Sequence, residues 1–243
     1  MSAVRACHDP PDCGISSVGR AIPCQGIGRE FEPLIPLQTL SVGTTFKELI
    51  MISESLVREL NQIAGSNMEG NLCYLHEQVP ENNQFFDGFE NKRKNIVAIA
   101  KKYNNITEIG FNAGHSAALM LSANPQLHLT SVDVGSHSYV VPCANVIQNY
   151  FPNRHKLIVK DSRKIDKVEI DQSDVVIIDG GHDFAGCLLD IAICIAYCKP
   201  ETLIVIDDYN YYTIAEAASR FSSSLIICNE FISDRDQGIF YLK

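Results

Sequence analysis

The chain has 243 residues, of which 46% are hydrophobic and 20% are charged. This composition is typical of a globular protein with room for one large α/β domain and an appendage. The formal net charge is -9, and basic residues occur only in short groups such as Lys92–Lys94, which we interpret as solvated helix faces. The charge balance argues against binding along a nucleic-acid backbone.

Membrane insertion and a disulfide framework are both disfavoured. The most apolar run, 184–198, is interrupted by Asp190, and residues 1–20 lack the apolar core of a signal peptide, so we expect a cytoplasmic protein. The nine cysteines form no paired CxxC units. The three between 187 and 198 recur at helical spacing among apolar residues, which indicates small buried side chains in a reducing compartment.

The first 50 residues lack helical or strand periodicity and are rich in Gly, Pro, Arg and Ser. Residues 14–37 resemble a translated transfer-RNA gene: Ser16–Ala21 fits the codons of a D arm, Phe31–Pro33 those of a T loop, and the flanking codons can close an acceptor stem. We therefore interpret 1–50 as an irregular extension created by gene calling, with a natural start near Met51. The alternative is a genuine N-terminal arm, and sequencing the native N-terminus separates the two.

From Ile52 onward the apolar residues recur at regular spacing. Apolar residues at helical spacing predict a helix over 52–63, and a second helix is predicted over 89–103. Between them, 66–83 is polar and reads as a loop that could form a lid over a substrate. We assign 51–104 to N-terminal helices with this lid, and 105–243 to the main domain.

The main domain alternates strand-like and helical patterns. Short apolar strands separated by helices predict a parallel sheet covered on both faces. Ser233–Gln237 is too short for a crossover helix, so the last two strands must be antiparallel. The fold class is thus α/β, with seven strands. The expected strands are 106–109, 127–134, 155–159, 174–179, 202–207, 224–231 and 238–242, and helices are expected after 114 and over 139–150, 184–198 and 214–221.

A glycine turn follows the first strand. Gly110 and Gly114 lie between a β-branched run and an Ala/Leu/Met-rich stretch, a pattern that fits a ligand-binding turn at a helix N-terminus or a plain turn. Asp133 follows Gly110 by roughly 20 residues, the separation at which a carboxylate reaches the hydroxyls of a nucleoside ribose. Asn112 stands between the glycines where a dinucleotide motif would have its middle glycine, which argues against a pyrophosphate ligand.

Carboxylates gather where the strands end. In an open parallel sheet the ligand lies beyond the carboxyl ends of the strands, so charged residues there are stronger candidates for a binding site than charged residues elsewhere. The polar residues at the successive strand ends are Asp133, Asp161 with Ser162, Asp179 with His182, and Asp207 with Asp208.

Five motifs in this order carry a family resemblance. Glu108–Ser116, Asp133–Tyr139, Asp161-Ser162, Ile178–His182 and Ile206–Asp208 resemble the motifs of class I S-adenosylmethionine-dependent methyltransferases. Within that class they are most similar to the group that includes macrocin-type sugar O-methyltransferases. The resemblance covers about 95–243 and implies a Rossmann-like sheet, mostly parallel, with a C-terminal antiparallel hairpin and helices on both faces.

The resemblance also implies a cofactor site for S-adenosylmethionine. Asp133 would take the ribose hydroxyls, and Asp161 with Ser162 would lie near the adenine. The methionine-side pocket is expected at Glu108, Gly110, Asn112 and Gly114, with Asp179 also on the cofactor side.

Asp179, Asp207 and Asp208 match positions that bind a divalent ion in the sugar-methylating relatives. Hard oxygen ligands suit Mg²⁺, which would hold and acidify a substrate hydroxyl. His182, with Asp179 nearby in sequence, is then placed to take the proton. As alternatives, the two adjacent aspartates could contact cofactor or cap a helix, and His182 could be a helix-start residue. Gly181 replaces a further acidic residue of such relatives, which weakens the sugar assignment more than the cofactor assignment.

The expected function is therefore O-methylation of a hydroxyl on a small molecule or sugar, with Mg²⁺ as a possible helper, no nucleic-acid or membrane partner and a possible homo-oligomer. A nicotinamide-dependent reductase and a non-catalytic cofactor-binding subunit are the alternatives. Tyr209, Tyr211 and Tyr212 could line an acceptor pocket or pack as aromatics, and His115 and His137 are expected to make local hydrogen bonds.

Overall fold

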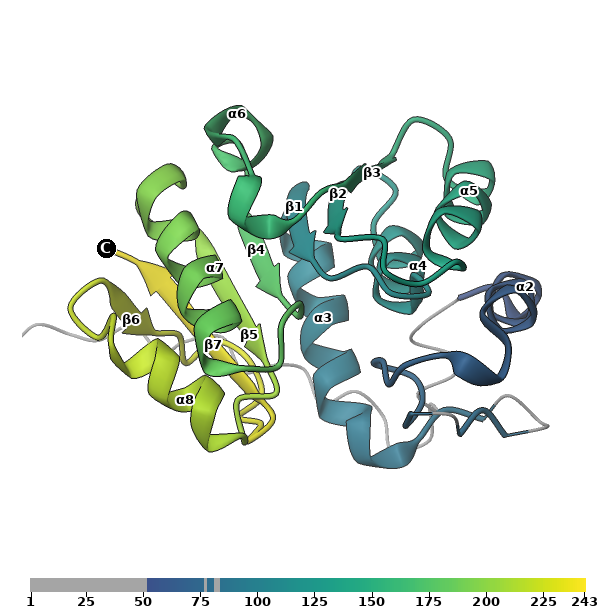
Figure 1. The fold of residues 1–243 in the computed structure, drawn as a ribbon, viewed down its shortest axis with the longest axis horizontal. Coiled ribbons are helices and arrows are strands. Elements are labelled where there is room, and N and C mark those ends of the chain that lie inside the picture. Colours follow the sequence, from purple (N-terminus) through teal and green to yellow (C-terminus); the bar gives the residue numbers. More distant parts are fainter. Residues whose placement is uncertain (1–51, 77, 81–83) are drawn as a thin grey trace, which may run out of the picture. The chain divides into compact units, whose positions relative to one another are not determined.

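The computed structural model describes residues 52–76, 78–80 and 84–243. The expectations for residues 1–50, including the resemblance to a transfer-RNA gene and the start near Met51, lie outside the described residues. Figure 1 shows the described part as a sheet with helices packed around it.

The sheet confirms the predicted fold class. Within the described residues it has seven strands in the order β3-β2-β1-β4-β5-β7-β6. The five strands from β3 to β5 are parallel, while β7 is antiparallel to both β5 and β6. The strands are β1 (Asn105–Ile109), β2 (His128–Asp133), β3 (His155–Val159), β4 (Val175–Ile178), β5 (Leu203–Asp207), β6 (Leu225–Ile227) and β7 (Gln237–Leu242).

Helices cover both faces because the central strands are apolar on both. In β4, Val175 and Ile177 pack into one core cluster, while Val176 and Ile178 pack into the other, as the two-residue period of a strand requires. No helix among the described residues has the length and apolar character needed to cross a membrane. The first cluster contains α2 (Glu54–Ala64), α3 (Glu90–Lys102), α4 (His115–Ala123) and α5 (Val140–Tyr150), and the second contains α6 (Lys167–Ile170), α7 (Phe184–Tyr197) and α8 (Tyr212–Ser219).

Part of the segment between α2 and α3 is buried, although its sequence is polar. Met68, Leu72, Cys73 and Tyr74 are buried in the first core cluster. The Tyr74 ring also packs edge-on against His115 at the start of α4. This part of the predicted loop is therefore anchored to the domain, and its proposed role as a lid stays a prediction.

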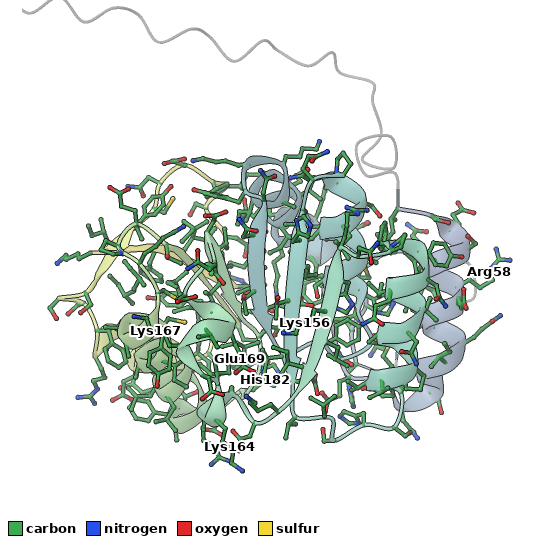
Figure 2. The ribbon with its side chains drawn as sticks, turned by 90° about the horizontal axis from the view of Figure 1, so that it is seen from above. Arg58, Lys156, Lys164, Lys167, Glu169 and His182 are labelled. Carbon is green, nitrogen blue, oxygen red and sulfur yellow. The ribbon has the colours of Figure 1, made fainter. Side chains whose placement is uncertain are left out.

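One strand end and one additional helix differ from the sequence-based expectation. The strand expected over 224–231 ends at Ile227, because the chain then turns toward α3, where Asn95 binds both the N–H and the carbonyl of Ile232. The short helix α6 was not expected; it begins with a capping box in which Asp166 and Glu169 satisfy each other's backbone N–H groups. Charged side chains elsewhere, such as Arg58, point outward in Figure 2.

Candidate active site at the strand ends

Only glycine fits at the first position of the turn. Gly110 follows β1 with φ 99°, and its N–H donates to the carbonyl of Val132 at 2.8 Å. A Cβ at this position would lie 1.9 Å from the carbonyl oxygen of Asp179. The ends of β1 and β4 therefore approach so closely that any side chain at residue 110 would force the backbone apart.

The second glycine begins α4. Gly114 has φ 81°, and a Cβ there would meet the Phe111 ring at 2.6 Å. Asn112, between the glycines, also has a positive φ, of 51°, which Asn tolerates better than most residues. Packing within the protein therefore explains part of the residue choice in this turn, whether or not a ligand binds there.

Asp133, at the end of β2, braces this turn. Its Oδ2 accepts from the backbone N–H of Phe111 at 2.9 Å and of Asn112 at 3.0 Å, and its Oδ1 accepts from the N–H of Gly135 at 2.7 Å. A carboxylate has about four lone-pair sites, so it keeps the capacity to accept further hydrogen bonds. The predicted partner of the glycine turn is therefore in contact with it.

Asn112 also ties the turn to the segment after α2. Its Nδ2 donates to the carbonyl of Gly70 at 3.0 Å, and its Oδ1 accepts from the Tyr139 hydroxyl at 2.8 Å. The Tyr139 hydroxyl in turn accepts from the N–H of Glu69 at 3.4 Å, and His137 pairs with the Glu69 carboxylate at 3.0 Å. His137 thus makes the local contact expected of it.

Glu108 lies beneath the turn. Its side chain accepts from the hydroxyl of Ser131 at 2.5 Å and of Ser116, in the first turn of α4, at 2.7 Å. The residue is 1% exposed, and this burial raises the pKa of the carboxyl to about 7 despite the two hydroxyl donors. In the described structure Glu108 therefore orients the helix start from inside the protein.

At the end of β3 the expected adenine-side residues are paired within the chain. Asp161 accepts from Nε of Arg163 at 2.8 Å and from its backbone N–H at 3.0 Å. These bonds with Arg163, the side chain first, lower the pKa of Asp161 to about 2. The hydroxyl of Ser162, at the start of the following turn (Ser162–Lys164), is bonded to the buried Asp190. Contact with adenine stays a prediction for both.

The second group of predicted residues meets at the ends of β4 and β5. Nδ1 of His182 donates to Oδ2 of Asp208 at 2.7 Å. This bond is the main reason why the pKa of His182 is raised to about 9, so that the ring is an imidazolium at neutral pH in the ligand-free protein. Asp208 has φ 54°, a strained backbone for a residue with a Cβ. Burial, and then repulsion by Asp207, hold the pKa of Asp179 well above its usual value.

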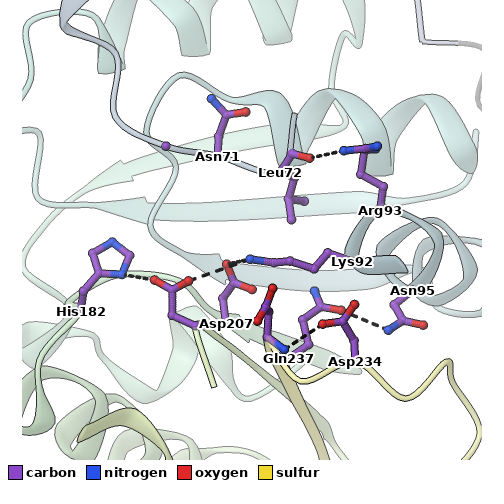
Figure 3. Close-up of polar contacts among 12 residues, drawn as sticks. Asn71, Leu72, Lys92, Arg93, Asn95, His182, Asp207, Asp234 and Gln237 are labelled. Carbon is purple, nitrogen blue, oxygen red and sulfur yellow. Dashed lines mark hydrogen bonds and ion pairs between the residues drawn. The ribbon is translucent and has the colours of Figure 1, made fainter. Parts of the chain in front are cut away.

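A lysine from α3 joins this group. Nζ of Lys92 donates to Oδ2 of Asp207 at 2.7 Å and lies 4.0 Å from Oδ1 of Asp208 (Figure 3). Lys92 is 4% exposed, so the interpretation of this basic group as a solvated face is wrong for it, and also for Arg93, which is 2% exposed. Burial lowers the pKa of Lys92, but attraction by the carboxylates outweighs this, and the net pKa is raised.

The sequence did carry a signal for Lys92. It precedes Ile96 and Ile99 by four and seven residues, the spacing of one helix face, and both isoleucines are buried. A lysine on the apolar face of a helix must pair with a buried carboxylate, because an unpaired ammonium there is costly. What the sequence does not contain is the identity of the partner, which lies 115 residues away.

Neighbouring residues fix the start of α3. Nη1 of Arg93 donates to the carbonyls of Leu72 at 3.0 Å and Phe86 at 2.9 Å. Nδ2 of Asn95 donates to Oε1 of Gln237, at the start of β7, at 3.1 Å. Figure 3 shows Arg93 bonded to Leu72, with Asn95 and Lys92 nearby. The lysine is thus held by an anchored helix rather than by a loop.

The folded carboxylates do not fit a divalent ion as they stand. Among the described residues, no group of three or more His, Cys, Asp or Glu side chains is arranged to hold a metal. Asp207 is paired with the Lys92 ammonium, and Asp208 is paired with His182. Oδ1 of Asp207 is buried with no hydrogen-bond partner, so one acceptor remains open. The positive charge here is supplied by side chains, and the magnesium site stays a prediction.

The tyrosines after β5 differ in their surroundings: one packs against another aromatic ring, and two are exposed. Tyr209 packs against Phe240 with the ring centroids 5.7 Å apart. Tyr211 and Tyr212 are 56% and 78% exposed. Tyr209 is thus an aromatic packing residue, whereas the other two are accessible to a ligand. His115 bonds Asn61 through Nε2 at 2.8 Å, the hydrogen-bonding role expected for it.

Comparison with known proteins agrees with this geometry. Residues 107–209 match a family model described as a methyltransferase domain. That range contains the glycine turn, Asp133 and the carboxylates after β4 and β5. No curated protein matches the sequence. The chain carries a methyltransferase domain, and the prediction of a methyltransferase is confirmed.

Solved structures share the fold at low sequence identity. A candidate caffeoyl-CoA O-methyltransferase from Staphylococcus aureus aligns with TM-score 0.55 and 14% identity over 79% of this chain and 92% of its own. A candidate O-methyltransferase from Klebsiella pneumoniae gives 0.55 and 14% over 81% and 92%. A protein from Corynebacterium glutamicum gives 0.51 and 13% over 63% and 81%. The fold is therefore the Rossmann-like fold of methyltransferases, and the macrocin-type grouping stays a prediction.

Proposed function

We propose that this methyltransferase takes its methyl group from S-adenosylmethionine and transfers it to a hydroxyl of a small molecule or sugar. One observation carries the proposal: a glycine turn braced by Asp133 lies at the same sheet edge as the His182–Asp208 pair. The strands that end there, β2, β1, β4 and β5, are consecutive in the sheet. The proposed cofactor site and the polar pair would thus lie along one edge of the sheet.

Asp133 and the glycine turn would hold the cofactor. The free acceptor sites of the Asp133 carboxylate suit the two ribose hydroxyls, and Gly110 and Gly114 allow the tight positive-φ turn beside which the methionine part would lie. Glu108 would position the turn through Ser116 instead of touching the ligand, because its carboxylate is buried. Bound S-adenosylmethionine would supply a methyl group already activated on a sulfonium.

His182 and Asp208 would serve the acceptor. The His182 side chain is 59% exposed and its Nδ1 is held by Asp208, which leaves Nε2 for a substrate hydroxyl. In its neutral form Nε2 accepts the hydroxyl proton as the oxygen takes the methyl group, and Asp208 stabilises the imidazolium that results. Because the ring is protonated at neutral pH, this role requires the ring to lose its proton before each turnover.

Labelled S-adenosylmethionine tests the proposal. Incubation with a panel of sugars, phenols and other small hydroxyl compounds should give a labelled methyl ether together with S-adenosylhomocysteine in equal amount. A panel of amines and thiols is the matched control and should remain unlabelled. Label found only on nitrogen or sulfur would refute the assignment to hydroxyl groups.

A further inference from the structure

The strongest unexplained feature of the site is the buried ammonium of Lys92. It reaches Asp207 at 2.7 Å from a different part of the chain and lies 4.0 Å from Asp208. A buried charge persists in a fold only when it is paired. The side chain also packs over the Phe89 ring, with Nζ 4.9 Å from its centroid. Lys92 is therefore a built part of the carboxylate cluster.

Two basic side chains already pair with carboxylates at the strand ends. The cluster consists of Asp179, Asp207 and Asp208 with Lys92 and His182, and each of the two paired aspartates has its own cationic partner. The Lys92 ammonium and the His182 ring thus occupy carboxylate oxygens that a divalent ion would need. An ion that bound Oδ2 of Asp207 would have to displace the ammonium, and an ion at the open Oδ1 would be repelled by it.

Displacement is opposed by the anchoring of α3. Arg93 donates to the carbonyls of Leu72 and Phe86, and Asn95 donates to the Gln237 side chain at the start of β7. Withdrawing the ammonium from Asp207 by moving the helix would break these bonds.

We propose that Lys92 is the resident cation of this site and that methyl transfer here needs no divalent metal ion. The inference rests on the proposed function. Lys92 acts as a positioning residue: it holds Asp207 and places Asp208, which in turn orients His182. The ammonium itself touches neither donor nor acceptor in this account.

Manganese titration followed by electron paramagnetic resonance tests the proposal without measuring turnover. The parent protein should bind no Mn²⁺ at the site, and the exposed Lys101→Met variant in the same helix should behave like the parent. Lys92→Met should gain a site at least roughly tenfold tighter than any parent binding, because a positive charge has been removed from beside the carboxylates. Lys92→Met/Asp207→Asn should lose that site again.

Two results would overturn the proposal: Mn²⁺ binding by the parent that disappears in Asp207→Asn, or a folded Lys92→Met variant that gains no site. Circular dichroism establishes folding, and if Lys92→Met does not fold, the parent and Asp207→Asn titrations decide alone. Calorimetric titration with S-adenosylhomocysteine on the same samples separates the two proposals. Absence of that binding refutes the proposed function, whereas the manganese result concerns Lys92 only.

Discussion

The two halves of the site are held together in different ways. In the proposed cofactor half, at the ends of β1 and β2, backbone N–H groups donate to Asp133 and glycines fit tight spaces. The acceptor half, at the ends of β4 and β5, depends on side-chain pairs, above all Lys92 with Asp207 and His182 with Asp208. The first half relies on backbone contacts, whereas the second relies on polar side-chain pairs, one of which joins residues 115 apart in the chain.

The largest effect is expected in the cofactor half. Gly110→Ala puts a Cβ against the Asp179 carbonyl at a positive φ, and we expect a loss of roughly 3 to 5 kcal/mol in unfolding free energy from overpacking and backbone strain together. Urea unfolding measures this loss. Gly65→Ala is the matched control: it has φ 65° and ψ -156° but no atom near the added Cβ, so it should cost only the backbone strain, about 2 kcal/mol. Equal losses would show that the close approach of β1 and β4 does not matter.

Glu108 should give the cofactor half a pH-dependent stability. Its pKa is about 7 in the folded protein against an ordinary 4.5, so the folded state holds the proton more tightly and stability falls as pH rises from about 4.5 to about 7. Glu108→Gln should remove up to about 3 kcal/mol of this fall. Unfolding curves across that pH range, with the exposed Glu59→Gln as control, measure the difference. Parallel curves for parent and Glu108→Gln would contradict the assignment.

Substitutions in the proposed acceptor half should lower the catalytic rate rather than the unfolding free energy. His182→Gln removes the proton acceptor, and we expect kcat to fall by roughly a hundredfold or more, with affinity for S-adenosylhomocysteine unchanged. Steady-state kinetics and calorimetry on the same protein measure both quantities. A variant with normal kcat would reduce His182 to a surface partner of Asp208, and weakened cofactor binding would mean that the halves are not independent.

The smallest effect concerns the contact between the glycine turn and the segment after α2. Tyr139→Phe removes the hydroxyl that binds Asn112 at 2.8 Å, and should cost about 1 kcal/mol of unfolding free energy. Tyr150→Phe removes an exposed hydroxyl bonded to Ser55, and should cost less. If the two variants are equally stable, the Tyr139 contact does not reinforce the turn.

The same contrast explains what the sequence could predict. Strand β3 has the expected bounds, and the glycine turn meets Asp133 as expected, because both follow from residue period and short-range spacing. Lys92 was assigned to the wrong environment, since burial of a charge depends on a partner that only the fold brings near. The end of β6 was placed too late for a similar reason: the apolar pattern continues, but Asn95 draws the backbone at Ile232 toward α3.

Calorimetric titration with S-adenosylhomocysteine, using the parent protein and Asp133→Ala, tests whether the glycine turn holds the cofactor. We expect saturable binding by the parent at one site per chain. We expect roughly hundredfold weaker binding by Asp133→Ala, because the ribose hydroxyls lose their acceptor and the turn loses its brace. Absence of binding by the folded parent, or equal affinity in the two proteins, would contradict a cofactor site at the glycine turn.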